Sequence, residues 1–590
     1  MALFAIETPR NLVSRVGDGS IVLHWDGVAD TNLSGYRVYR AASLSGPFGV
    51  QNLALLTSPS YCDARATNGV TWYYRVTAVA QPGQESEPSA AIQAAARPFV
   101  SDEDFLEYVQ QTAFDYFWYE SNPVNGMVRD RSTPASPCSI AAVGFGLTAI
   151  GIGIDHGWIT RAQGRARVLQ TVRSFWTLPQ GDQTSGTAGH NGWFYHFLDM
   201  RTGLRYTPFQ TELSSIDTAL LLAGILYAGE YFDGPHPDEV EIRQLAEAIA
   251  NRIDWNWMAQ GTNVLSMGWM PGSGFLASKW IGYNEASILY ILGLGAEINP
   301  LPASSWDRWT AGYRWATNYG QAYVPFAPLF GHQYSQCWLD LRHTADNYMR
   351  GKSITYFENS RRATIAQRAY CAANPKGYGY STNVWGLTAC DGPGGYSARG
   401  APPPENDDGT IAPTAPGGSM PFAPEYCLPA LRTMYDRYRA QIWTGYGFRD
   451  AFNLRQNWWA SDVLGIDEGP IVVMIENHRS QSVWRLFMKN KQVQRGLKRA
   501  GFAPLPSVAP RVRAVPEQGS VTLEWDSVLS GTYQVEYSAN LAHWFPSPTG
   551  HVLADNAPVA RWLDTGPPAT LSSPFYVAAR FYRVYQLGPP

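Results

Sequence analysis

The pattern of apolar and polar positions divides the chain into three parts. Near both ends the two kinds of residue alternate, as in half-buried β-strands, for instance over Ser20–Asp26 and Thr71–Ala78. Between residues 102 and 502 apolar residues recur at helical spacing instead. We therefore expect a multidomain protein with two small all-β domains, 1–100 and 509–590, on either side of a helical domain at 101–503.

The predicted helices of the central part are of two kinds. Those at 139–155, 214–232, 284–296 and 470–487 are apolar on most faces, whereas those at 160–177 and 237–256 have one charged face. Further helices are predicted at 103–121, 304–319, 333–350, 354–373, 425–439 and 490–500. About twelve helices, buried ones alternating with half-exposed ones, predict two concentric rings, an (α/α)6 barrel. A plain helical solenoid would show repeats of fixed period, and the sequence has none.

One buried helix begins beside a candidate catalytic residue. The run from Thr218 to Phe232 is apolar nearly all the way round, so it belongs inside a larger assembly. Ser214 and Asp217 have the spacing of a capping box, which places the start of the helix at about Ser214. Glu212 then falls just outside the cap, at the rim of a rigid core, where an acid catalyst could sit. A solvated loop glutamate would show the same pattern.

The two β-rich ends resemble each other. Gly19–Asp26 reads GSIVLHWD and Gly519–Asp526 reads GSVTLEWD, and Tyr36–Arg40 has a counterpart in Tyr533–Tyr537. Short strands with turn residues between them are typical of a β-sandwich. The motifs resemble fibronectin type III domains, including the Tyr-Tyr-Arg-Val strand at 73–76. Such modules could be spacers or stabilising domains, or they could bind sugar.

Composition narrows the class of function. The chain has 590 residues, 16% of them charged, and a net charge of −4, which argues against a nucleic-acid surface. Its 22 Trp and 33 Tyr are numerous, and such residues in polar loops often stack on sugars. No segment reaches the ~20 apolar residues of a membrane span, so no membrane insertion is expected.

Cysteines and the N-terminus give little information about the compartment. The six cysteines show no metal-binding spacing; Cys371 and Cys390 could close a short loop, but free thiols fit as well. The N-terminus lacks a signal peptide, although a mature chain that had lost one would look the same.

The loops of the helical part carry many carboxylates but no other catalytic signature. There is no G-x-S-x-G, H-E-x-x-H or P-loop, and the ten histidines form no ligand cluster, so we expect neither metal nor cofactor. His196 and His332 are interpreted as hydrogen-bonded structural or sugar-contacting residues. Glycoside hydrolysis needs one carboxylic acid and one carboxylate, and both are available here. Spacing cannot choose among them, because the partners come from different helices.

A family resemblance covers essentially all of 102–502. The stretches that carry it include FDYFWYESNPVNGMVRDRS (114–132), TELSSIDTALLLAGIL (211–226), WIGYNEASILYILGLG (280–295) and GLTACDGPGGY (386–396). They resemble the glycoamylase-like (α/α)6-barrel group, which includes the endo-β-1,2-glucanases of glycoside hydrolase family 144 and a domain of cyclic β-1,2-glucan synthases. The resemblance implies hydrolysis of β-1,2-glucan outside the cytoplasm, secreted or periplasmic, with inversion expected.

The resemblance also implies roles for individual residues. Glu212 is the expected general acid, with Asp130 and Glu285 as candidates for the base or nucleophile. Asp217 is expected to cap its helix and brace Glu212. The expected substrate-binding residues are Arg131, Trp193, Tyr195, Asp217, Trp280, Tyr283, His332, Gln333, Asp391 and Glu468. Glu468 stands where relatives more often have Gln, which leaves the choice of base open.

Two alternatives remain at this stage. The chain could be a transglycosylase or a hydrolase of another β-glucan on the same fold, with the same acid but different acceptor contacts. It could also be a non-catalytic glucan-binding protein.

Overall fold

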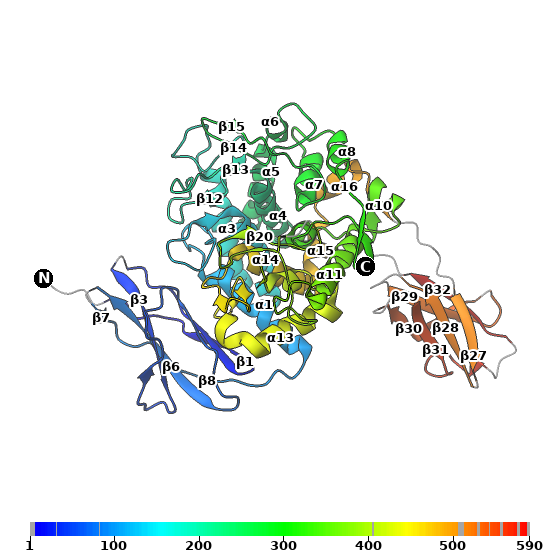
Figure 1. The fold of residues 1–590 in the computed structure, drawn as a ribbon, viewed down its shortest axis with the longest axis horizontal. Helices are drawn as coiled ribbons and strands as arrows, with labels where there is room; N and C mark the ends of the chain where they lie inside the picture. Colours follow the sequence, from blue (N-terminus) through cyan, green and yellow to red (C-terminus); the bar gives the residue numbers. More distant parts are fainter. Residues whose placement is uncertain are drawn as a thin grey trace. The chain divides into compact units, whose positions relative to one another are not determined.

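The structure, a computed structural model, describes residues 6–30, 32–81, 83–403, 406–504, 512–517, 519–527, 532–541, 543–554, 559–574 and 579–586. The chain forms two compact units (Figure 1). The first comprises Met1–Arg342, Asp346–Met349 and Ile354–Phe502, and the second His343–Ala345, Arg350–Ser353 and Ala503–Pro590. The first unit holds an N-terminal β module, residues 6–97, and a helical body, residues 102–342 and 354–502.

The N-terminal module consists of two antiparallel sheets around one apolar core. One sheet has the order β1 (Val13–Gly17), β2 (Ser20–His24), β5 (Ser60–Asp63). The other has the order β4 (Gly49–Val50), β3 (Leu33–Ala41), β6 (Thr71–Ala80), β7 (Gln84–Glu85), and β8 (Ile92–Ala95) also pairs with β6. Trp25, Tyr36 and Tyr74 are fully buried in the core between the sheets. The strand predictions at 20–26, 36–40 and 71–78 are therefore confirmed.

Buried helices form the centre of the helical body. They are α2 (Ile140–Asp155), α4 (Ser215–Tyr231), α7 (Ser287–Gly295), α9 (Phe330–Gln333) with the 3-10 turn η1 (Tyr334–Cys337), α12 (Thr414–Gly418) and α14 (Gly465–Arg479). Each packs against the next in this order, and α14 packs back against α2, so the series closes on itself. Gly144 and Gly224 show how closely α2 and α4 approach, because a Cβ on Gly224 would lie 2.0 Å from the Gly144 carbonyl oxygen.

Helices that are only partly buried cover this centre. They are α1 (Asp102–Tyr119), α3 (Arg161–Thr177), α5 (Pro237–Arg252), α8 (Ser304–Thr310), α11 (Tyr356–Ala373) and α13 (Pro424–Ile442). In the sequence they alternate with the buried helices, as the pattern predicted. In the part of the chain that the structure describes, no helix combines the length and the apolar character needed to cross a bilayer.

Three of the predicted helices are wrong in extent. The one expected at 470–487 is two helices, since α14 begins at Gly465 and ends at Arg479, and α15 covers Ser482–Phe487. The helix expected at 304–319 ends at Thr310 and is followed by the hairpin of β16 (Ala316–Asn318) and β17 (Gln321–Tyr323). The one expected at 333–350 is broken into η1, a two-residue strand β18 (Thr344–Ala345) and α10 (Asn347–Gly351). The short helix α12, in a stretch rich in Gly and Pro, was not predicted. All six cysteines are free thiols, so Cys371 and Cys390 do not form a disulfide.

The second unit contains two further three-stranded sheets. Their orders are β27 (Val512–Glu517), β28 (Ser520–Asp526), β31 (Val559–Asp564) and β30 (Phe545–Leu553), β29 (Thr532–Ser538), β32 (Phe581–Gln586). Trp525 and Val535 are buried in a core that both sheets share. The short pair β18 and β26 (Ala503–Pro504) also belongs to this unit.

Candidate active site

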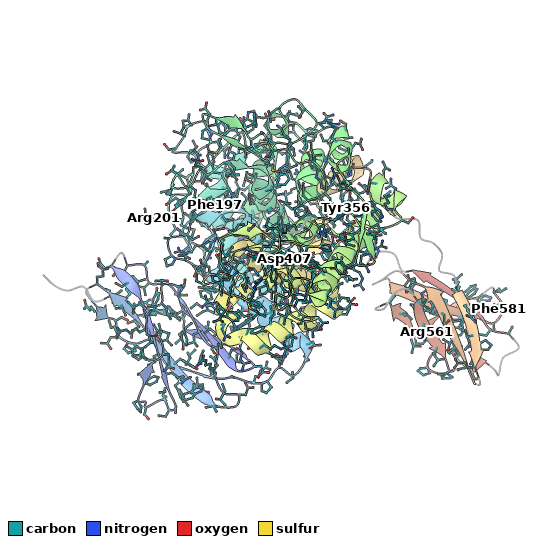
Figure 2. All side chains as sticks on the ribbon, in the orientation of Figure 1. Phe197, Arg201, Tyr356, Asp407, Arg561 and Phe581 are labelled. Atoms are coloured by element: carbon teal, nitrogen blue, oxygen red, sulfur yellow. The ribbon has the colours of Figure 1, made fainter. Side chains whose placement is uncertain are left out.

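His196 stands between two carboxylates at the start of α4, hydrogen-bonded to Glu212 and paired by charge with Asp217. The bridge between Tyr195 and Leu213, together with the bond from the His196 N–H to the Glu212 carbonyl (2.9 Å), aligns the two segments. His196 Nδ1 lies 3.1 Å from Glu212 Oε1, and its Nε2 lies 3.6 Å from Asp217 Oδ2. The imidazole stacks on Phe197, with ring centroids 3.9 Å apart; Phe197 is labelled in Figure 2.

The predicted cap at Ser214 is confirmed, but the group differs from a full capping box. The Ser214 hydroxyl accepts from the Asp217 N–H at 3.3 Å, as expected of an N-cap. The Asp217 carboxylate, however, bonds to the Ser214 hydroxyl and faces His196. Asp217 therefore braces His196 directly and Glu212 only through it.

His196 and Glu212 shift each other's pKa values. Burial opposes protonation of His196, but the negative charges of Asp217, Glu212 and Asp130 and the hydrogen bond to Glu212 raise its pKa to about 9. Burial would raise the pKa of Glu212, yet the hydrogen bond and charge of His196 hold it below its usual value. Near neutral pH His196 and Glu212 thus form an ion pair that shares one exchangeable proton.

Asp130 and Arg131 belong to a loop that is fixed against the start of α14. The Asp130 N–H donates to the Pro137 carbonyl and the Asp130 carbonyl accepts from the Gly465 N–H, both at 2.8 Å. Burial raises the pKa of the Asp130 carboxyl against the lowering effect of Arg131 and His196. The charges of His196 and Asp217, the two groups next to Glu212, thus both contribute to the pKa of Asp130.

Arg131 is the cation on the other side of Asp130. Its guanidinium lies 2.9 Å from Asp391, 3.4 Å from Asp462 and 3.6 Å from Asp130. Burial opposes its charge, but these carboxylates raise its pKa. Arg131 and Asp391 keep 30% and 21% of their side chains exposed, so both remain available to a ligand.

Glu285 precedes α7 and is the third predicted catalytic carboxylate. Its carbonyl oxygen accepts from the Ser335 hydroxyl at 2.6 Å, which ties it to η1. Burial, with a smaller contribution from the Asp217 charge, raises the pKa of its carboxyl to about 7. The Asp217 charge thus contributes to the raised pKa values of both Glu285 and Asp130.

Sequence reasoning left Asp450 and Asp467 out of the predicted site, although both lie among its acidic neighbours. Burial raises the pKa of both carboxyls, and the charge of Asp450 raises the pKa of Asp467 further. The Asp391 N–H donates to Asp450 Oδ2 at 2.6 Å, which connects this pair to Arg131. The signal in the sequence was that both carboxylates stand in glycine-containing stretches, GFRD and GIDEG.

Several predicted substrate contacts lie in the protein core instead. Trp193 is fully buried, donates its indole N–H to the Asp254 carbonyl (2.9 Å) and packs on Trp255. Tyr195 is also fully buried, and Trp280, 6% exposed, donates to the Ser215 hydroxyl (2.8 Å). None of the three has a ring face open to a sugar in this structure.

Three polar residues predicted as contacts are buried as well. Gln333 donates to the Ala415 carbonyl and to the Ser419 hydroxyl, both at 2.7 Å, and so supports α12. Burial lowers the pKa of His332 to about 3, so its ring is neutral near pH 7. Glu468 is 2% exposed, and burial raises its pKa. Tyr283 is half-buried against the His332 ring, with centroids 4.8 Å apart.

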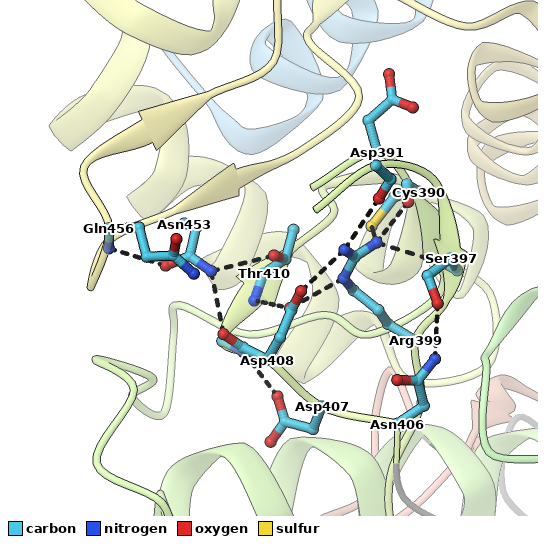
Figure 3. A network of polar contacts seen from close by, with 12 residues as sticks. Cys390, Asp391, Ser397, Arg399, Asn406, Asp407, Asp408, Thr410, Asn453 and Gln456 are labelled. Carbon is cyan, nitrogen blue, oxygen red and sulfur yellow. Dashed lines mark hydrogen bonds and ion pairs between the residues drawn. The ribbon is translucent and has the colours of Figure 1, made fainter. Parts of the chain in front are cut away.

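The loop that follows Asp391 is held by a second network (Figure 3). Arg399 forms two bonds of 2.9 Å with the Asp408 carboxylate and also donates to the Cys390 carbonyl at 2.6 Å. Figure 3 shows the Asp391 side chain pointing away from Arg399, in agreement with its bond to Arg131. The network therefore fixes the backbone of the loop and leaves the Asp391 carboxylate free to face the site.

Comparisons with known proteins identify the family. The chain is 31% identical over 533 residues, 84% of its length and 71% of the relative's, to an exo β-1,2-glucooligosaccharide sophorohydrolase (non-reducing end) from Parabacteroides distasonis. The chain belongs to the glycoamylase-like family, glycoside hydrolase family 144. It is therefore a glycoside hydrolase. The Glycoamylase family model matches residues 277–491 of this family 144 enzyme.

Two solved structures extend the comparison. A β-1,2-glucanase from P. distasonis superposes with a TM-score of 0.77 at 28% identity, over 85% of this chain and 73% of the other. An endo-β-1,2-glucanase from Chitinophaga pinensis, solved with sophorotriose and glucose, gives a TM-score of 0.63 at 31% identity, over 68% of this chain and 99% of the other.

Proposed function

We propose that this family 144 enzyme hydrolyses the β-1,2-glucosidic bonds of sophoro-oligosaccharides or of the polysaccharide. The observation that carries the proposal is the group of Glu212, His196 and Asp217 with Asp130 and Glu285 around it. Glycoside hydrolysis requires one carboxyl group that donates a proton and one carboxylate that activates water or attacks carbon, and this group holds candidates for both. The names of the relatives, a sophorohydrolase and an endo-β-1,2-glucanase, support the choice of linkage.

In the proposed reaction Glu212 protonates the glycosidic oxygen. A glucan bound over the 28% exposed Glu212 displaces water, and burial favours a neutral pair over an ion pair. The shared proton then moves from His196 to Glu212, and Glu212 delivers it to the leaving oxygen. His196 therefore stores the proton, and its other nitrogen remains directed to Asp217.

Asp130 is the proposed base. It is partly exposed, and although burial raises its pKa, the charge of the neighbouring Arg131 opposes that rise and favours the carboxylate. Asp130 accepts a proton from water as the water attacks the anomeric carbon on the face opposite the leaving group, which inverts the configuration. Arg131, Asp391 and Tyr283 are proposed contacts for glucosyl hydroxyls and ring faces.

Glu285 supplies a second assignment for the acid. Its pKa of about 7 leaves a large fraction of its carboxyl protonated near neutral pH, before any substrate binds. In this alternative Glu285 donates the proton, and Glu212 and His196 orient the substrate.

The architecture fits this function. We infer that the closed series of buried helices and the covering helices constitute an (α/α)6 barrel, and that the β modules at 1–100 and 509–590 are of the fibronectin type III kind on either side of a catalytic domain at 101–503. Sandwiches of this kind are common in cell-surface proteins, which supports the proposed secreted or periplasmic location.

The experiment compares E212Q, E285Q and D130N, with E425Q as control because Glu425 pairs with Arg361 on α11 and has no contact with the site. Each is assayed on β-1,2-, β-1,3- and β-1,4-glucan and on an aryl β-sophoroside whose leaving group needs no proton. The true acid variant loses activity on glucan and keeps it on the aryl substrate. D130N should recover activity with azide, and NMR of the first product gives the anomer.

Three results would count against the proposal. Cleavage of another β-glucan in preference to β-1,2-glucan would overturn the linkage. Full glucan activity in E212Q would remove Glu212 from the mechanism. Selective survival of E285Q on the aryl substrate would assign the acid to Glu285.

A further inference from the structure

The N-terminal module is joined to the helical body through a buried histidine. His24, at the end of β2, is fully buried between the rings of Tyr119 on α1 and Tyr446, with centroids 4.4 Å and 5.4 Å away. Its Nε2 lies 2.9 Å from the Gly445 carbonyl oxygen and 3.3 Å from Asp115 Oδ2. His24 therefore holds α1 and the turn at 444–447 at once.

From Tyr446 the contacts continue to the loop that carries Asp130. The Tyr446 hydroxyl donates to Glu120 Oε1 at 2.8 Å, and Glu120 Oε2 pairs with Arg129 Nε at 3.0 Å. The Arg129 N–H also donates to the Glu120 carbonyl at 3.1 Å. Glu120 is 4% exposed, so both of its carboxylate oxygens depend on these partners. Arg129 immediately precedes Asp130.

The module also touches the far end of the same loop. The Ser58 hydroxyl donates to the Ser132 carbonyl at 3.3 Å, just beyond Arg131. Nearby, Ser60 approaches the body so closely that a Cβ on Gly445 would lie 1.7 Å from its hydroxyl oxygen. The segment 129–132 is thus held at one end through Tyr446 and Glu120, and at the other by Ser58.

We infer that the N-terminal module helps to position the active site. His24, Tyr446 and Glu120 are positioning residues. Together they hold the loop that carries Asp130 and Arg131 in place. The inference rests on the proposed function, in which Asp130 is the base. A spacer would pack on the body without a route to the site. Here the route begins with the stacking of His24 on Tyr446 and continues through directional bonds to Glu120 and Arg129, and such contacts transmit a displacement to the groups they hold.

The test uses two variants on the route and one matched control beside it. E120Q removes the charge that pairs with Arg129, and Y446F removes one bond to Glu120 while keeping the ring that stacks on His24. S20A is the control: Ser20 is equally buried at the same interface, and its hydroxyl bonds to Tyr108 and Tyr435, away from the loop.

We expect kcat on β-1,2-glucan to fall roughly 10-fold in E120Q and less in Y446F, with a smaller change in KM, because a misplaced base slows the chemical step more than it weakens binding. S20A should keep the parent kcat at temperatures well below its unfolding transition. Equal losses in all three variants, or none in E120Q, would overturn the inference.

Hydrogen exchange gives a readout that does not require activity. The N–H groups of Arg129, Asp130 and Arg131 are all bonded, to Glu120, Pro137 and Ser136. They should exchange faster in E120Q and Y446F than in the parent and in S20A. Unchanged exchange would refute the positioning role. A parent enzyme that does not cleave β-1,2-glucan would refute the proposed function alone.

Discussion

Replacing His196 with glutamine removes the positive charge beside Glu212 and keeps a polar side chain of similar reach. The pKa of His196 is about 9, against 6.5 for the residue in an unfolded chain. A difference of about 2.5 units corresponds to about 3 kcal/mol, at ~1.4 kcal/mol for each unit. The side chain is 28% exposed, so solvent screens only part of this interaction.

The direction of the pH dependence follows from the raised pKa. Stabilisation by the imidazolium is complete below about pH 6.5 and is lost as the pH rises through about 9. The difference in the free energy of unfolding between the parent and H196Q should therefore shrink by about 3 kcal/mol between about pH 6 and pH 10. Urea unfolding of both proteins across this range measures it, and a constant difference would refute the ion pair.

The same variant separates the two assignments of the acid. If Glu212 is the acid, the proton that it shares with His196 is lost near pH 9 in the parent. The value of kcat/KM should then fall as the pH rises through about 9, which is the basic limb of the pH profile. In H196Q that limb should move down by several pH units, toward the range of a carboxyl group. A basic limb near pH 7 in both proteins would instead assign the acid to Glu285.

Three further predictions concern residues that support the site. G445A should destabilise the protein by about 1–3 kcal/mol in urea unfolding, because its Cβ would meet the Ser60 hydroxyl. S60G should restore part of the lost stability in this variant. An unchanged unfolding midpoint in G445A would contradict the close approach. W193F should cost about 1–3 kcal/mol by removing the bond from the indole N–H to the Asp254 carbonyl, yet KM for sophoro-oligosaccharides should stay at the parent value; a raised KM would make Trp193 a substrate contact after all. R399K cannot keep both bonds to Asp408, so limited proteolysis should cut the loop at 391–408 faster than in the parent, and an equal rate would exclude an anchoring role.

Helices could be predicted from the sequence where one continuous helix buries a whole run of apolar residues. The cap at Ser214 and the apolar run that ends at Phe232 gave the limits of α4 to within one residue at each end, because the cap marks the start and the run shows how far the helix stays buried. The prediction failed at 333–350, where apolar and aromatic residues are buried by η1 and by turns rather than by one continuous helix. The spacing of apolar residues cannot distinguish these cases, since it indicates which residues are buried and not whether the backbone there is a helix, a 3-10 turn or a loop.

The candidate site shows the same limit more sharply. Glu212 could be singled out because it flanks a recognisable cap, but its partner His196 lies 16 residues earlier and faces it only because Tyr195 bridges to Leu213. Aromatic content pointed to sugar stacking, yet Trp193 and Trp280 are buried with their indole N–H groups bonded inside the protein. A tryptophan count cannot separate a platform from a core residue. The reactive state of Glu212 depends on where one proton rests, and segments distant in the sequence set that position.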